Sequence, residues 1–212
     1  MKYSKGEYGL MRILVKPRHI AKAFGAMLLA PLRIRRYPPE APDDSIHYVI
    51  PTLAATKDLA ATQANDLPVA RTSQGRWTKW PPLVLAGCDE PLVEGAPDLR
   101  GVWQVYKGPL KGHIERVEQA GARVVITAGG IIHDLTADGA PMTDEGVGGA
   151  GINVAAHYES GRLNLYLNNK RLMVTRYRDG NDLIWRWGPY RNHLRRLNDP
   201  HGSVAAEPPE LA

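Results

Sequence analysis

The second half of the chain predicts a single antiparallel β-barrel of eight or nine strands, and three observations carry that prediction. From Leu99 onward, apolar and polar residues alternate with a period of two, as they do in strands with one face on a core. The separators between the alternating runs are short and contain Gly or Asn, which tight hairpin turns favour. No helical period lies between the runs, and a meander of this length closes on itself. The predicted fold class is therefore mainly β, with the barrel spanning 98–198.

The alternation also sets the expected strands. It is clearest in 162–168, where Leu163, Leu165 and Leu167 share one face. The connection 137–151 breaks the pattern because it is long and holds five glycines, so we expect a loop at the open end of the barrel that acts as a lid. The candidate strands are 99–106, 111–118, 123–127, 131–136, 152–159, 162–168, 171–178, 182–187 and 190–197.

The first half of the chain predicts a basic helical arm followed by an extended, Pro-rich segment. Residues 1–36 carry nine Lys/Arg against one acid, a net charge of +8, whereas the remainder has 18 basic and 21 acidic residues, a net charge of −3. Apolar residues at helical spacing, such as Ile20, Phe24 and Leu28, predict an amphipathic helix in this arm. Residues 37–97 are predicted to pack in extended form on the barrel or on a partner, and 199–212 to be a disordered tail.

A basic arm on a near-neutral body indicates an acidic partner, which is a membrane surface, a nucleic acid or another protein. We expect residues 1–97 to mediate association with a second copy or a partner protein, with membrane-surface binding as an alternative. Cys88 is the only cysteine, so no intramolecular disulfide and no cysteine metal cluster can form. This favours a cytoplasmic location, peripheral to the membrane if the arm binds lipid.

The first barrel strand carries a recognisable motif. Gly101-Val-Trp103, entered through Pro97-Asp-Leu-Arg, resembles the Gly-x-Trp opening strand of the lipocalin and calycin superfamily. The resemblance covers about 100 of 212 residues and lacks the family's middle motif. It implies that Trp103 closes the barrel beneath a last-strand Arg, for which we choose Arg195 over Arg196 and Arg191. It also implies one apolar or amphipathic ligand, and a few relatives of this kind host haem or catalyse isomerisations and cyclisations.

Histidines and arginines are the residues that could bind a metal, a haem or an anionic ligand inside such a barrel. His133 lies on the same face of its predicted strand as the apolar Ile131 and Leu135, so we expect it to face inward. The orientation of the other histidines in predicted strands stays open. Haem or a metal held by histidine is not favoured, because no pair has ligand spacing within one strand. We therefore assign no metal ligands and leave the cofactor unknown.

Residues 170–196 combine eight basic side chains with four Tyr or Trp, which is the composition of a single-stranded nucleic-acid surface. The alternation in Leu183-Ile-Trp185-Arg-Trp187 favours a barrel wall instead, with the arginines solvated or pairing with a ligand carboxylate inside. The glycines of 146–151 match a dinucleotide fingerprint, but a strand rather than a helix is predicted to follow them.

The sequence therefore predicts a lipocalin-like barrel that binds a small amphipathic or anionic organic ligand. Two alternatives stay open: a cavity enzyme of isomerase or cyclase type that uses His or Tyr as acid and base, and an accessory or structural subunit of a larger complex. The predicted ligand-binding residues are Tyr106, His133, His157, Tyr166, Arg176 and Trp185.

Overall fold

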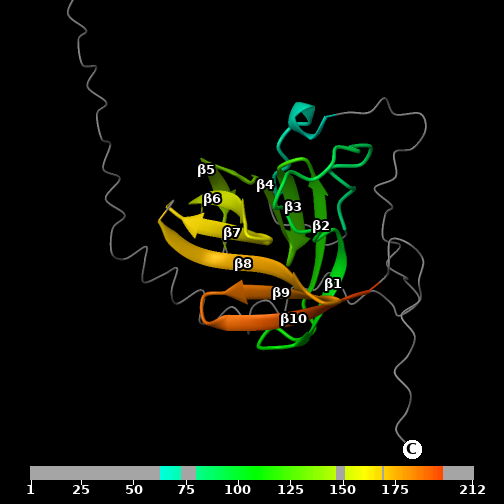
Figure 1. Cartoon of the computed structure of the whole chain (residues 1–212), viewed down its shortest axis with the longest axis vertical. Coiled ribbons are helices and arrows are strands. Elements are labelled where there is room, and N and C mark those ends of the chain that lie inside the picture. The colour runs from blue at the N-terminus through cyan, green and yellow to red at the C-terminus, as the bar shows by residue number, and fades with distance from the viewer. Residues whose placement is uncertain (1–62, 73–79, 147–150, 169, 198–212) are drawn as a thin grey trace, which may run out of the picture.

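The computed structural model describes residues 63–72, 80–146, 151–168 and 170–197. The helical arm predicted over 1–36 and the tail predicted over 199–212 lie outside these residues. The described chain forms ten strands and one short 3-10 helix, η1 (Ala64–Asp66) (Figure 1). The strands are β1 (Gly101–Lys107), β2 (Ile114–Ala120), β3 (Arg123–Ala128), β4 (Ile131–Thr136), β5 (Asp138–Glu145), β6 (Gly151–Glu159), β7 (Arg162–Leu167), β8 (Arg171–Asp179), β9 (Asp182–Trp187) and β10 (Tyr190–Arg196).

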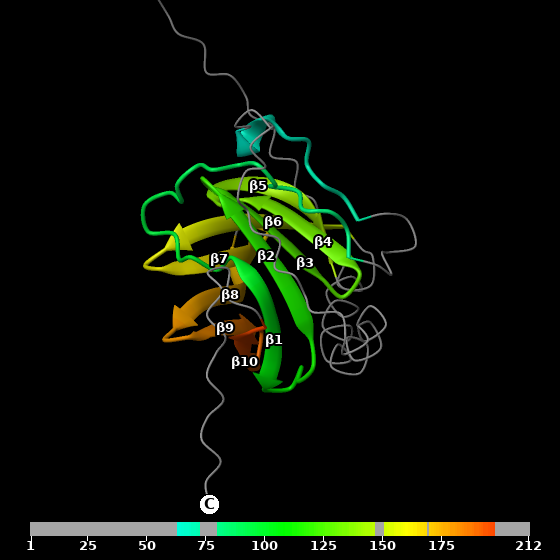
Figure 2. The same ribbon diagram turned by 90° about the vertical axis from the view of Figure 1, so that its right-hand side faces the viewer.

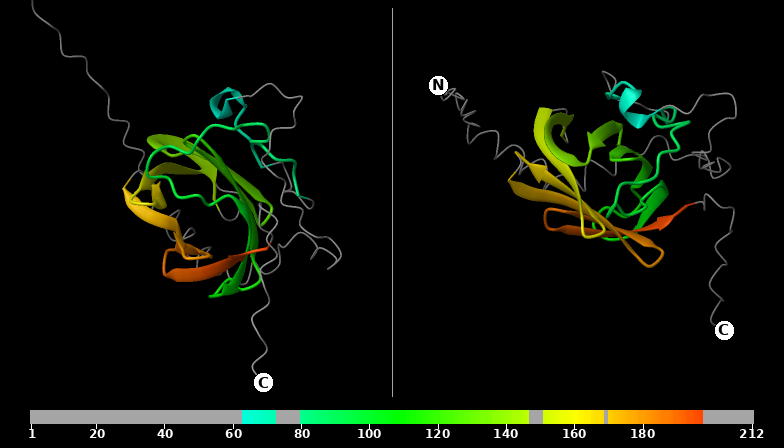
Figure 3. Two further views of the ribbon diagram at one scale, coloured as in Figure 1. Left: turned by 45° about the vertical axis from the view of Figure 1, so that its right-hand side comes forward. Right: turned by 45° about the horizontal axis from the view of Figure 1, so that its top comes forward.

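All ten strands belong to one antiparallel sheet that curls into a nearly closed barrel (Figure 3). The strand order is β4-β3-β2-β1-β10-β9-β8-β7-β6-β5, so the first strand pairs with the last and the chain is otherwise a simple meander. β4 and β5 are the two ends of the sheet, although only Ala137 separates them in sequence. We call the boundary between these two strands the seam. The predicted mainly β, antiparallel barrel is confirmed.

The strand count is ten rather than the predicted eight or nine, because β5 occupies most of the stretch expected to be an open loop. β5 pairs with β6 alone, and its register shifts between Asp138 and Pro141. Proline and glycine are tolerated on such an edge strand, since one side of it needs no ladder hydrogen bonds. Most of its side chains are exposed or half-buried, so it lacks the apolar alternation that marks the other strands.

The barrel interior holds the main hydrophobic core, which includes side chains from most of the strands. Leu99, Trp103, Val124, Leu183 and Leu194 are fully buried in it. Burial of large side chains at this density supplies most of the stability of a small β domain.

A second, smaller core lies on the outer face of the sheet. Ala64, Leu85 and Cys88, which precede the barrel in sequence, pack against Ala120 of β2 and Val125 of β3. Figure 2 shows this side of the molecule, with β1 to β4 toward the viewer and η1 above them. None of the helical segments in the described ranges combines the length and the hydropathy that crossing a bilayer requires.

Candidate functional site

One end of the barrel is closed by Trp103, which we call the floor. The indole Nε1 donates to the carbonyl of Leu99 at 2.8 Å, and the Arg178 and Arg196 guanidinium carbons each lie 4.8 Å from the ring centroid. The Nη2 atom of Arg196 donates to the carbonyl of Arg100 at 2.7 Å. Cations over an indole gain cation–π attraction, and here they also cover the end of the core.

The predicted partner of Trp103 was Arg195, and the structure places Arg196 there instead. Leu194 is buried in the core, so the period of two turns residue 196 inward and residue 195 outward. Arg195 is exposed, and its Nη2 donates to Oε1 of Gln104 at 3.3 Å.

The opposite end of the barrel, which we call the mouth, is lined by half-buried apolar side chains. Antiparallel register brings the beginnings of β6, β8 and β10 to this end, and with them Ile152, Met173 and Tyr190. Trp187 joins them from the end of β9, stacked on Trp185 with ring centroids 6.1 Å apart. A hollow of about 420 Å³ lies beside Met142 of β5; its other lining residues are Pro141, Thr143, Asn153 and Asn168. At this end of the barrel, Ile152, Met173 and Tyr190 are packed against the core and are partly exposed to solvent.

An ion pair bridges opposite walls of the barrel interior, at a level between the mouth and the floor. Nη2 of Arg176 on β8 lies 3.0 Å from Oε2 of Glu115 on β2, and its Nε lies 3.2 Å from Oε1. β2 and β8 are not neighbours in the sheet, so the pair spans the lumen rather than joining adjacent strands. The two side chains are 0% and 6% exposed. Such burial is expensive unless the two charges are paired, as they are here.

His113 and Trp185 lie beside this pair. Their ring centroids are 5.2 Å apart, and the guanidinium carbon of Arg176 lies 5.0 Å from the indole of Trp185. Burial lowers the pKa of His113 to about 4, with the Glu115 carboxylate raising the pKa and Arg176 lowering it. The imidazole is therefore neutral at pH 7.

Three buried nitrogens in this region have no hydrogen-bond partner within the described part of the chain: Nε2 of His113, Nε1 of Trp185 and Nδ2 of Asn192. Asn192 stands opposite Trp185 in the β9–β10 register, and its Oδ1 accepts from the backbone N–H of Leu110 at 3.0 Å. A buried polar group without a partner destabilises a fold by about 1–3 kcal/mol. We refer to Glu115, Arg176, His113, Trp185 and Asn192 together as the polar cluster.

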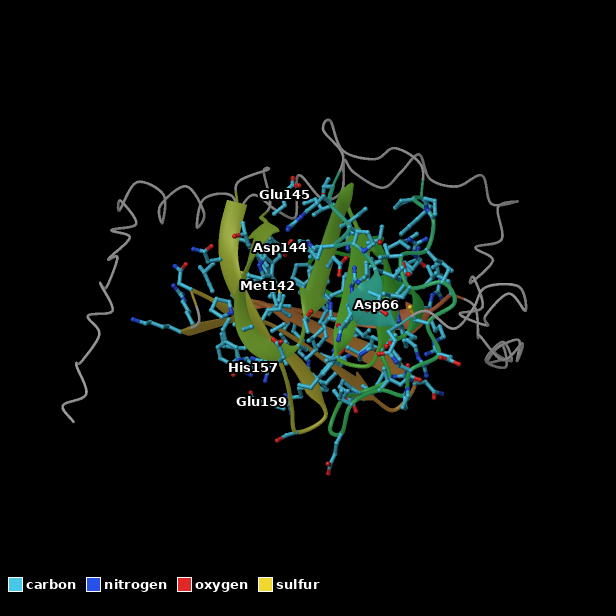
Figure 4. All side chains as sticks on the ribbon, turned by 90° about the horizontal axis from the view of Figure 1, so that it is seen from above. Asp66, Met142, Asp144, Glu145, His157 and Glu159 are labelled. Carbon is cyan, nitrogen blue, oxygen red and sulfur yellow. The ribbon has the colours of Figure 1, made fainter. Side chains whose placement is uncertain are left out.

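A second polar contact lies at the seam. Nδ1 of His133 on β4 is 2.7 Å from Oδ2 of Asp144 on β5, and Oδ1 of Asp144 accepts the backbone N–H of Glu145 at 2.8 Å. The His133 side chain is 24% exposed. Figure 4 places Asp144 in the space between the olive strands and the green strands.

The structure brings together only some of the six residues predicted to bind a ligand. Arg176 and Trp185 belong to the polar cluster, and His133 faces inward at the seam; a binding role for these three stays a prediction.

The other three lie on the outer surface of the sheet. Tyr106 donates its hydroxyl hydrogen to Oδ2 of Asp182 at 2.5 Å. His157 packs edge to face on Tyr166, with centroids 5.5 Å apart, and the Tyr166 hydroxyl donates to Glu159. The period of two explains the outward position of His157, because Val154 and Ala156 of its strand β6 are in the core.

Glu115, His113 and Asn192 are the members of the cluster that were not predicted as ligand-binding residues. The sequence did contain a signal for Glu115. It lies two positions before the apolar Val117 in a predicted strand and so on the same face, and a charge on a core face needs a partner. Within the described ranges, no three His, Cys, Asp or Glu side chains are grouped closely enough to hold a metal ion.

No protein-family model matches the chain, and no curated protein matches its sequence. Among solved structures, the chain is similar to human cRBP IV, a cellular retinol-binding protein, with 14% sequence identity and a TM-score of 0.42. The match covers 47% of this chain and 98% of that chain. The antiparallel meander barrel that the Gly101-Val-Trp103 motif predicted is present, and its first-strand Trp103 lies under the last-strand Arg196.

Proposed function

We propose that the barrel binds one small amphipathic organic molecule through its mouth. The observation that carries this proposal is the polar cluster, in which three buried nitrogens lack a partner in the described residues next to a paired Glu115 and Arg176. Proteins seldom leave buried polar groups unpaired, so a cluster of three such groups needs an explanation, and a bound molecule that supplies acceptor atoms provides one.

The surroundings of the cluster suit the rest of such a molecule. Trp185 and Trp187 supply flat aromatic area, and Met142 and Met173 supply flexible apolar side chains that adapt to different shapes. Small-molecule sites have this composition: a mostly apolar lining with a few convergent polar groups. The bound molecule would rest its apolar part on the mouth and direct its polar end toward the cluster.

The test is a binding assay with a variant that fills the mouth and a matched control. Met173 packs against the core, whereas its neighbour Leu172 is half-exposed on the outer surface. Nile red and a fluorescent fatty-acid analogue serve as probes, read by their own emission. We expect the wild-type protein and Leu172→Trp to bind at least one probe with similar affinity, and Met173→Trp to bind it at least tenfold more weakly. Equal binding by both variants would contradict a site in the mouth.

Native mass spectrometry of the protein purified from its own source provides the second measurement. An excess mass of a few hundred daltons over the denatured chain is expected if the natural ligand is retained. A bare mass, together with no binding of either probe, would overturn the proposal.

His133 favours a second candidate function, acid–base catalysis on the bound molecule. The 2.7 Å contact with Asp144 fixes the orientation of the ring, and a carboxylate-oriented imidazole is the arrangement that general-base catalysis uses. The test is hydrogen–deuterium exchange at carbon in a ligand incubated with the protein in D₂O. Exchange that is lost in His133→Gln, while binding persists, would support an isomerase-type activity; no exchange with any bound ligand would contradict it.

For the basic arm we propose association with an acidic partner, either a protein or an anionic membrane surface. The support is the net charge of +8 over residues 1–36. Because residues 64–88 include side chains that pack on the barrel, the informative deletion is 1–62, which leaves those contacts in place. Loss of vesicle binding or of self-association on deletion, with ligand binding retained, is the expected result; unchanged association would contradict a role for the arm.

A further inference from the structure

We infer that the barrel selects uncharged ligands, and that the polar end of the ligand is an acceptor oxygen such as that of an amide, ester, ketone or alcohol. This inference rests on the proposed binding function and concerns the chemical class of the molecule that the mouth accepts. It narrows the sequence-based expectation, which allowed an anionic ligand.

The first argument is the charge balance of the polar cluster. Glu115 and Arg176 make a two-point contact and are almost completely buried, so their charges cancel. His113 adds no charge at pH 7, because burial lowers its pKa to about 4. A ligand carboxylate placed here would be a second anion beside Glu115 with one cation between them. In a medium of low polarity that arrangement is costly, since like charges repel strongly and neither is hydrated.

The second argument is the chemistry of the unpaired nitrogens. Nε1 of Trp185 and Nδ2 of Asn192 are donors only, and neither donates to any residue that the structure describes. Nε2 of His113 donates or accepts according to the tautomer of the ring. A neutral carbonyl oxygen accepts two hydrogen bonds and brings no charge, so it satisfies donors without disturbing the ion pair.

A cationic ligand fits less well for the same reasons. The carboxylate of Glu115 already accepts from two nitrogens of Arg176, so it offers little to a second cation. Two of the three groups that need partners, Nε1 of Trp185 and Nδ2 of Asn192, are N–H donors only, and they repel an ammonium hydrogen.

The test compares ligands that share one hydrocarbon tail and differ at the end group. A long-chain carboxylate, its primary amide, its methyl ester and the tail-only hydrocarbon displace Nile red from the full-length protein at pH 7. We expect the amide and the ester to bind at least tenfold more tightly than the carboxylate. A carboxylate that binds more tightly than the amide would overturn the inference and leave the binding function intact, whereas failure of every probe and ligand to bind would overturn both.

Two variants make the assignment specific. Trp185→Phe keeps a ring and removes the donor, so the ratio of amide affinity to hydrocarbon affinity is expected to fall about fivefold. Trp187→Phe is the comparison variant: it also reduces the aromatic area of the mouth, which weakens the amide and the hydrocarbon alike, but the Trp187 nitrogen is not one of the unpaired three. The ratio is expected to stay within twofold in this control, and an equal fall in both variants would contradict a donor role for Trp185.

Glu115→Gln tests the charge argument directly. It leaves the Arg176 charge without its counter-ion, so the preference is expected to reverse and the carboxylate to bind at least tenfold more tightly than the amide. An unreversed preference in a folded variant would contradict the charge balance. If this variant does not fold, the wild-type end-group series and the Trp185 comparison still decide the inference.

Discussion

Nδ1 of His133 lies 2.7 Å from Oδ2 of Asp144, and this contact joins β4 to β5, the two strands at which the sheet ends. The backbone ladder runs from β4 round the barrel to β5 and does not connect them. Residues 70–72 lie along the same seam. Ala70 donates its backbone N–H to Asp134 of β4, Thr72 accepts from the N–H of Ile132, and Arg71 donates to the carbonyl of Thr143 on β5. The barrel is therefore closed at the seam by side chains and by a segment from outside the sheet.

Replacing His133 is expected to loosen the seam. His133→Ala removes the bridge and leaves Asp144, which is largely buried, without its ring partner. We expect a loss of about 1–2 kcal/mol in the free energy of unfolding, and faster amide hydrogen exchange in β4 and β5 than in β8 and β9. Hydrogen-exchange mass spectrometry measures the local effect.

His193→Ala is the matched control for this prediction. His193 also faces an aspartate, with Nδ1 3.5 Å from Oδ2 of Asp182, but it lies on strands that the sheet already pairs. Its replacement is expected to leave exchange at the seam unchanged. Equal protection of β4 and β5 in wild type and His133→Ala would show that the bridge does not hold the seam.

The Glu115–Arg176 pair predicts an asymmetric response to mutation. Either single replacement, Glu115→Gln or Arg176→Met, leaves a buried charge alone and is expected to lower the free energy of unfolding by about 3–5 kcal/mol. The double variant removes both charges, so its loss is expected to be well below the sum of the single losses. A double-mutant cycle in urea measures the coupling, and additive losses would contradict a direct pair across the lumen.

Much of the fold was predictable from the sequence because alternation reports one strand at a time. Arg162-Leu163-Asn164-Leu165 identifies a strand without any knowledge of its neighbours. β5 carries no such signal, since an edge strand with exposed side chains and Gly139 and Pro141 in it reads as a loop. The sequence therefore predicts the barrel and misses the strand that forms one side of the seam.

The candidate site depended on relations that alternation does not report. Glu115 and Arg176 meet because β2 and β8 face each other across the barrel. The distance between these two strands is set by the number of strands and by their register, and neither strand's own sequence reports it. Choosing between Arg195 and Arg196 required knowing which face of the last strand points into the barrel. Leu194 is buried, and residues 194 and 196 lie on the same face. Tyr106, His157 and Tyr166 lie on the outer face for the same reason, because each directly follows a core residue in its strand.

Arg123 is expected to fasten residues 64–70 to the outer face of the barrel. Its side chain is 4% exposed and contacts both carboxylate oxygens of Asp134 at 2.8 and 2.6 Å. It also donates to the backbone carbonyls of Leu67 and Pro68, each at 2.8 Å, and to that of Ala64. Removing it leaves a buried Asp134 without its cationic partner and several carbonyls without their donor.

For Arg123→Ala we expect a loss of about 3–5 kcal/mol in the free energy of unfolding, with early proteolytic cleavage near residues 64–70. Arg123→Lys keeps the charge but not the planar fork, so it is expected to recover only part of the loss. Arg162, which is exposed over the ring of Tyr177, provides the control, and Arg162→Ala is expected to change the free energy of unfolding by less than about 1 kcal/mol. Similar losses in the two alanine variants would contradict the fastening role.

His113 predicts a loss of stability in mild acid. The pKa of a histidine in an unfolded chain is about 6.5, and in the folded protein burial lowers that of His113 to about 4. Well above pH 6.5 the ring is neutral in both states and its contribution is constant. Between pH 6.5 and 4 the unfolded chain binds a proton that the folded chain does not, so the free energy of unfolding falls as the pH falls, by about 3 kcal/mol when the transition is complete.

The measurement is the free energy of unfolding in urea at pH 7 and at pH 4.5 for the wild type, His113→Gln and His193→Gln. The wild type and His193→Gln are expected to lose about 2–3 kcal/mol more between the two pH values than His113→Gln does. Each variant is referred to its own value at pH 7, which removes any loss from changed packing around Trp185. Equal losses in all three proteins would contradict a lowered pKa for His113 in the folded protein, and would remove one of the reasons for expecting His113 to carry no charge beside the ligand.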